Sequence, residues 1–242
     1  MELRLVGSEM CIRDSYSMGG IPTNTDGRVL ASRDSLVDGL FAAGECACVS
    51  VHGANRLGSN SLLECVVYGR RTGAAIAEFV EGRKLPDIEE ERYLKEARAK
   101  IQGLLDHSGE YRINFLREQF QDAMSQHCGV FRSQDVMEQG FEKLEQLQQQ
   151  YQQVYLDDRG KLWNTEIIEA LELRSIIVVG ETILSSALSR KESRGAHSRE
   201  DFTERNDQDF LRHTLAYYSL AGIDIGYRPV TISMFEPKER KY

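Results

Sequence analysis

The central part of the chain, residues 90–194, carries apolar residues at helical spacing. Four helices are expected there: near residues 90–105, 115–127 and 133–155, and a long one that Asn164 or Thr165 caps and that ends near Ser193. The connections between them are short, which favours antiparallel packing of neighbouring helices. This region is therefore predicted to form a helical bundle.

The residues before position 84 follow a different pattern. An apolar run at residues 40–43 is typical of a strand and stops at Gly44. A loop of small and polar residues follows, and a helix is predicted over residues 61–80. One side of that helix is small or apolar, which suits close packing against a sheet or a cofactor; it comprises Leu62, Cys65, Val66, Gly69, Thr72, Gly73, Ile76 and Phe79.

The last part of the chain changes character again, from a charged loop to short apolar segments. Strands are expected at residues 214–218, 223–227 and 230–234. The first residues, in contrast, show no clear periodicity. The pattern thus divides the chain into four zones: residues 1–15, 16–84, 90–194 and 195–242.

Composition narrows the choice of function. The chain of 242 residues is 41% hydrophobic and 28% charged, as in an ordinary globular protein. Its net charge of −8 argues against a nucleic-acid-binding surface, so an anion site would have to be local, built from arginines and backbone amides. The five cysteines show no metal-ligand spacing. No apolar run approaches the roughly 18 residues of a membrane span, and residues 1–15 lack the apolar middle of a signal peptide.

Two features suggest a ligand site between the strand and the helix. Glu45 follows the strand and Gly44, where its carboxylate could accept hydrogen bonds from ligand hydroxyls. It could equally be a solvated acid at a strand end. Ser61 and Leu62 open the helix, whose exposed amides and positive dipole end would stabilise negative charge. Ser61 and Glu64 have the spacing of a capping box, so the same residues could be only a well-capped helix start.

Arg56 is the more specific candidate for a ligand-binding residue. It lies in a loop of small residues with few carboxylates nearby in sequence, and a guanidinium there can bind a carboxylate through two parallel hydrogen bonds. The other interpretation is a loop arginine in a structural salt bridge. His52, in the same loop, could orient a ligand or pack structurally, and a lone loop histidine is more often structural.

Several motifs together resemble the flavoprotein subunit of succinate dehydrogenase and fumarate reductase. The likeness begins with YSMGGI at residues 16–21, LFAAGE at 40–45 and VHGANRLGSNSL at 51–62. It continues with CGVFR at 128–132, SRKESRGAH at 189–197 and HTL at 213–215. The resemblance covers roughly residues 16–242. The fold class that follows is an α/β remnant of an FAD-binding domain, then an α-helical bundle, then a small α+β C-terminal tail.

The resemblance also implies a chemistry. In this family the positions of Glu45, Ser61 and Leu62 contact FAD, Arg56 holds a carboxylate of succinate or fumarate, and Ser59 lies next to the same substrate. A hydride passes between a substrate carbon and the flavin, and electrons then pass to an iron–sulfur subunit and a quinone. Membrane anchor subunits are contacted only indirectly. The expected location is peripheral, on the cytoplasmic face of the inner membrane.

The chain departs from the family at its start. The family has a substrate-binding histidine where this chain has Ser15, and residues 1–15 look foreign to it. We therefore expect residues 1–15 to be a non-native prefix joined to a truncated gene. The glycine-rich dinucleotide loop, the histidine that carries covalent FAD in many members, and the proton-transferring arginine are missing. No catalytic residue is assigned, and the chain alone is expected neither to hold FAD tightly nor to turn over.

Two other interpretations remain. L-Aspartate oxidase shares the HGANR loop at residues 52–56 and a similar helix start, but it lacks a tail like residues 201–242. A second possibility is a non-catalytic fragment, in which residues 90–242 act only as a docking module for the iron–sulfur partner. Co-purification with that partner without flavin would be its signature.

Overall fold

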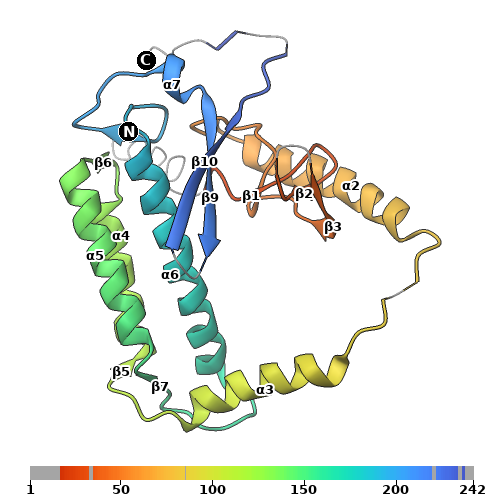
Figure 1. Ribbon diagram of the computed structural model, residues 1–242, viewed down its shortest axis with the longest axis vertical. Coiled ribbons are helices and arrows are strands. Elements are labelled where there is room, and N and C mark those ends of the chain that lie inside the picture. Colours follow the sequence, from red (N-terminus) through yellow and green to blue (C-terminus); the bar gives the residue numbers. More distant parts are fainter. Residues whose placement is uncertain (1–16, 33–34, 85, 220–221, 234–235, 238–242) are drawn as a thin grey trace, which may run out of the picture. The chain divides into compact units, whose positions relative to one another are not determined.

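The computed structural model describes residues 17–32, 35–84, 86–219, 222–233 and 236–237. It is a mixed α/β structure of long helices and small two-stranded sheets (Figure 1). The chain divides into two compact units. Unit 1 contains the described parts of Met1–Pro86, Arg194–Ala196 and Val230–Tyr242, and unit 2 contains those of Asp87–Ser193 and His197–Pro229. The predicted prefix at residues 1–15 lies outside the described residues.

Unit 2 is built on three helices that pack against one another: α4 (Ile113–His127), α5 (Gln134–Tyr151) and α6 (Thr165–Ser189) (Figure 1). Helix α3 (Glu90–Asp106) contacts α6. The core gathers apolar side chains from the three packed helices, among them Leu116, Met137, Leu144, Leu173, Ile177 and Leu184, each no more than 1% exposed. Removing such side chains from water supplies most of the stability of this unit.

Short parallel strand pairs tie the helix ends of unit 2 together. β5 (Tyr111–Arg112) pairs with β7 (Val154–Tyr155), and β6 (Phe131–Arg132) pairs with β8 (Ser198–Arg199). A longer antiparallel hairpin, β9 (Arg212–Ser219) with β10 (Gly222–Pro229), packs on α6. The short helix α7 (Asp207–Phe210) precedes this hairpin.

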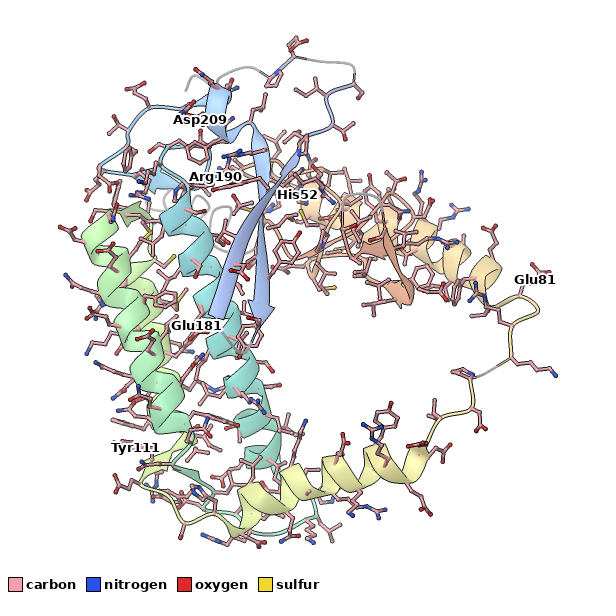
Figure 2. The ribbon with its side chains drawn as sticks, viewed as in Figure 1. His52, Glu81, Tyr111, Glu181, Arg190 and Asp209 are labelled. Carbon is pink, nitrogen blue, oxygen red and sulfur yellow. The ribbon has the colours of Figure 1, made fainter. Side chains whose placement is uncertain are left out.

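Helix α6 has a polar start and one buried acid. Asn164 caps it, since its side-chain oxygen accepts a hydrogen bond from the Ile167 N–H at 3.2 Å, as predicted. Further along the helix lies Glu181, which is labelled in Figure 2. It is 6% exposed and accepts a hydrogen bond from the Gln148 side chain on α5. Burial raises the pKa of the Glu181 carboxyl, because a charged carboxylate is disfavoured away from water.

Two predicted helix ends and one predicted strand are wrong. α5 ends at Tyr151 instead of residue 155, because Val154 and Tyr155 pair with β5 as strand β7. α6 ends at Ser189, four residues early, because Arg190 leaves the helix with extended backbone angles. The third tail strand does not form: residues 230–233 have no strand structure, and residue 234 lies outside the described residues.

Unit 1 contains two further short strand pairs and helix α2 (Asn60–Val80). β1 (Ile21–Pro22) runs parallel to β4 (Ala47–Cys48), and β2 (Arg28–Leu30) runs antiparallel to β3 (Leu36–Phe41). Helix α2 packs on β3, where the Phe79 ring meets the Phe41 ring edge-on at 5.5 Å.

The predicted packing side of α2 is only partly buried. Thr72 is 5% exposed, whereas Leu62 and Val66 are 72% and 71% exposed. Leu63 and Val67 add further exposed apolar surface to the same first half of the helix. Within the described residues, the first half of α2 therefore has an apolar surface that is largely exposed.

Candidate functional site

Two motifs that are distant in sequence meet at the β1–β4 pair. The Ile21 N–H donates to the Cys46 carbonyl at 2.9 Å, and the Ser17 N–H donates to the Glu45 carboxylate at 2.9 Å. Gly20, with φ +108°, lies so close to this turn that a Cβ there would sit 2.5 Å from the Cys46 oxygen. Only glycine fits at Gly20. The structure thus brings the GG motif against the turn that carries Glu45, whose own side chain remains exposed.

The start of helix α2 is open to an anion. Its N-cap residue, Ser59, has φ +65° and makes no side-chain cap hydrogen bond, and the first turn holds no acidic residue. The amides of Ser61 and Leu62 belong to this first turn. Because the positive end of the helix dipole is not offset by a carboxylate of its own first turn, negative charge placed there is stabilised.

The predicted capping box is wrong. Glu64 does not return to the helix start; its Oε2 pairs with His52 Nε2 at 2.5 Å, with side-chain exposures of 2% and 9%. This contact ties the loop before α2 to the helix itself. His52 therefore has a structural partner, the second of the two roles considered for it.

Arg56 lies in the loop between His52 and α2 and is 7% exposed. A guanidinium that is buried within a loop of small residues is held in place rather than extended into solvent. Arg56, Ser59, Ser61 and Leu62 form one short stretch at the α2 N-terminus, while Ser59 and Leu62 remain exposed. The arrangement offers a held cation, an open helix end and, in the same unit, the exposed carboxylate of Glu45. These donors and acceptors suit a ligand with both hydroxyl and anionic groups.

A dense polar network in unit 2 was not anticipated from the sequence as a physical feature. Arg199 is 1% exposed and makes two hydrogen bonds of 2.6 Å to the Asp201 carboxylate. Its remaining Nη1 donates to the carbonyls of Ala187 and Arg190 at 3.2 Å each. The Arg199 guanidinium lowers the pKa of the Asp201 carboxyl to about 2, because it hydrogen-bonds the charged form.

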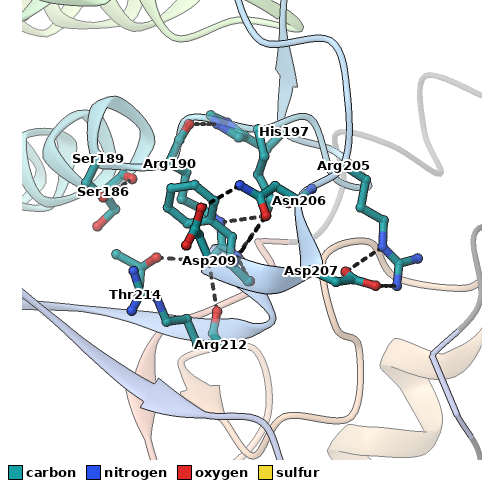
Figure 3. Close-up of polar contacts among 12 residues, drawn as sticks. Ser186, Ser189, Arg190, His197, Arg205, Asn206, Asp207, Asp209, Arg212 and Thr214 are labelled. Atoms are coloured by element: carbon teal, nitrogen blue, oxygen red, sulfur yellow. Dashed lines mark hydrogen bonds and ion pairs between the residues drawn. The ribbon is translucent and has the colours of Figure 1, made fainter.

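Arg190 organises the other half of the network (Figure 3). It donates to the Arg212 carbonyl and the Thr214 hydroxyl at 2.9 Å each, and to the Phe210 carbonyl. It also pairs with Glu192, which is fully buried and accepts a hydrogen bond from the Asn206 N–H. The signal available in the sequence was the group of charged residues at 190–194, which does not by itself indicate burial.

His197 lies between these arginines. Its Nδ1 accepts a hydrogen bond from Arg132 at 3.0 Å, so the ring proton is on Nε2, which donates to the Arg190 carbonyl at 3.2 Å. Burial lowers the pKa of His197 to about 4, and the charges of Arg132, Arg199 and Arg190 act in the same direction. The imidazole is therefore neutral at pH 7.

Comparisons with known proteins match the first and the last part of the chain to known families. Residues 4–62 match the FAD binding domain family, and residues 117–242 match the family described as fumarate reductase flavoprotein C-term. The fold is thus that of a flavoprotein, and FAD is its cofactor. The chain belongs to the succinate dehydrogenase and fumarate reductase flavoprotein family.

Individual relatives agree. The chain is 40% identical over 223 residues to the succinate dehydrogenase flavoprotein subunit of Rickettsia bellii, and 38% identical over 229 residues to the fumarate reductase flavoprotein subunit of Haemophilus influenzae. These alignments cover 90% and 94% of this chain but only 37% of each relative. A quinol fumarate reductase variant from E. coli superposes with a TM-score of 0.84 at 36% identity, over 93% of this chain and 38% of that one. The chain thus spans well under half the length of these relatives.

No helix in the described part of the chain is long and apolar enough to cross a membrane. The same residues hold no cluster of histidine, cysteine and carboxylate side chains able to bind a metal ion.

The neutral, buried His197 predicts a pH dependence of stability. Its folded pKa of about 4 lies below the ordinary 6.5, so the unfolded chain binds more protons between these values. Its stabilising contribution is fully present above pH 6.5 and is lost as the pH falls toward 4, with a slope approaching about 1.4 kcal/mol per pH unit. We expect urea unfolding, followed by circular dichroism from pH 7 to 4, to show this loss.

The variant His197→Asn, whose amide does not titrate, should flatten the slope. A remainder should persist from His213, whose pKa is also lowered by burial and by Arg228 and Arg190. An unchanged slope in His197→Asn would show that the imidazole is not held neutral in the folded chain.

Proposed function

We propose that this chain is the C-terminal portion of a flavoprotein subunit that interconverts succinate and fumarate. In this proposal its electrons pass to an iron–sulfur subunit and from there to a quinone, with membrane anchor subunits as indirect partners at the cytoplasmic face of the inner membrane. The observation that carries it is the buried Arg56 beside an α2 N-terminus that no acidic first-turn residue offsets. That geometry suits a dicarboxylate held next to an electron-rich ring.

Each residue then has a definite role. Arg56 binds one carboxylate of the substrate through two parallel hydrogen bonds, which fixes its orientation as well as its charge. Ser59, in the left-handed conformation at the helix start, lies beside the same substrate. FAD, when bound, supplies a hydride acceptor or donor. The role of the protein on this side of the ring is to position the substrate carbon and to keep charge balanced.

The cofactor contacts follow from the open groups of unit 1. The exposed carboxylate of Glu45 would accept hydrogen bonds from cofactor hydroxyls. The first-turn amides at Ser61 and Leu62 would stabilise negative charge that develops on the reduced ring. The fit of these residues to FAD rests on the absence of a side-chain cap and of a first-turn acid in α2.

The proposal distinguishes the succinate/fumarate reaction from L-aspartate oxidation. We expect a chimera, in which residues 17–242 replace the aligned part of the Rickettsia bellii subunit, to reduce an artificial electron acceptor with succinate and not with L-aspartate. The unmodified Rickettsia bellii subunit is the control. Turnover with L-aspartate in place of succinate would refute the proposal and favour the oxidase.

The isolated chain is proposed to be inactive. In support, Leu62 and Val66 on the first half of α2 are more than 70% exposed, as expected of one wall of a cofactor site, and the chain covers 37% of the Rickettsia bellii subunit. We expect the purified chain to carry no stoichiometric flavin and to show no succinate-dependent reduction of an acceptor. Flavin absorbance that co-purifies in equal amount with the protein would contradict this.

A further inference from the structure

A small segment of unit 1 comes from a distant part of the sequence. Residues 194–196 belong to unit 1, although the chain on both sides of them belongs to unit 2. Their contact is with the loop that carries Arg56: the Ala196 N–H donates to the Ala54 carbonyl at 3.0 Å. Ala54 lies two residues before Arg56, so this hydrogen bond fixes the backbone from which that loop arginine extends.

The contact requires glycine at position 195. Gly195 has φ +59°, and a Cβ built on it would lie 2.4 Å from the Ala54 oxygen and 2.6 Å from the Ala54 carbonyl carbon. These are backbone atoms, so no side-chain rotation can relieve the clash. Either the Ala54 peptide or the Gly195–Ala196 backbone would have to move.

The two ends of the segment are held firmly. Ser193 Oγ donates to the Phe202 carbonyl at 2.8 Å, and the Arg199 N–H donates to Ser193 Oγ at 2.8 Å. The Ser193 N–H also donates to the Glu204 carbonyl at 3.1 Å. The buried Arg199 side chain bonds Asp201 and two carbonyls near the end of α6. Residues 194–196 are thus the tip of a loop whose base is closed.

We propose that Gly195 is a positioning residue for Arg56. Within unit 1, the Gly195–Ala196 backbone fixes the Ala54 peptide, and the Ala54 peptide sets where Arg56 begins. The contacts of Gly195 and Ala196 with Ala54 support the positioning of the Arg56 loop. Only the identity of the ligand, a dicarboxylate bound by Arg56, rests on the proposed function. A residue remote in sequence would in this way govern the orientation of the substrate carboxylate.

Hydrogen exchange of single amides in the full 242-residue chain tests this. In Gly195→Ala, exchange at Ala196 and at Asn60, whose N–H bonds the Leu57 carbonyl at 3.2 Å, should rise on the order of tenfold. Exchange at Ile21, which bonds Cys46 elsewhere in unit 1, should not change. The Arg56 Nε–H resonance should also shift, which general loosening of unit 1 would not do selectively.

Two further variants distinguish the steric clash with Ala54 from the strain of a left-handed backbone. Gly82→Ala is the control, because Gly82 also has a positive φ, +69°, but a Cβ there meets nothing within 4 Å. It should leave Asn60 exchange and the Arg56 resonance unchanged. Gly195→Asn tolerates the left-handed backbone but keeps the clash with Ala54, so it should behave like Gly195→Ala.

The outcomes are decisive without any ligand. Unchanged exchange at Asn60 in Gly195→Ala, or an equal rise at Ile21, would overturn the positioning role. Wild-type behaviour in Gly195→Asn would also overturn it, since only backbone strain would then matter. Because neither readout uses flavin or a dicarboxylate, failure here leaves the proposed function intact, and failure of the succinate assay leaves this result intact.

Discussion

The buried Arg199 guanidinium is the polar group that holds the end of helix α6 in unit 2. Its charge is offset by Asp201 through two short hydrogen bonds, and it also binds two carbonyls near the end of helix α6. Removing one partner of such a pair would leave an uncompensated charge in the interior, which is strongly destabilising. The same residue lies on β8, which pairs with β6, so one side chain fixes a helix end and a strand.

The candidate site depends on backbone as much as on side chains. Gly20 and Gly195 each lie too close to a neighbouring carbonyl for any Cβ, at Cys46 and Ala54 respectively. These two close backbone contacts hold the turn that contains Glu45 and the loop that contains Arg56. The His52–Glu64 pair then connects that loop to α2. Local polar contacts therefore organise a unit whose buried apolar cluster is small.

The sequence predicted the helices of residues 90–194, because their apolar residues recur at helical spacing. It limited the α6 cap to Asn164 or Thr165 because that signal is local, and Asn164 is the cap. It failed where a tertiary contact decided the outcome: α5 ends early because Val154 pairs with β5, and Glu64 binds His52 instead of closing a capping box. Burial of Arg199 and Glu192 could not be foreseen, since charge patterns do not reveal which partners fold together. The roles of Glu45, Arg56, Ser59, Ser61 and Leu62 stay predictions.

The most direct test of the account is whether Arg56 holds a dicarboxylate next to the flavin. Malonate, which cannot be oxidised as succinate is, would be titrated into the chimera while the flavin absorption spectrum is followed. Arg56→Ala should lower the affinity for malonate, measured from this spectral change, by about 100-fold, because the substitution removes the charged partner of a malonate carboxylate. Arg71→Ala, at a half-exposed surface pair with Asp26, should leave it unchanged. Wild-type malonate affinity in Arg56→Ala would contradict the account.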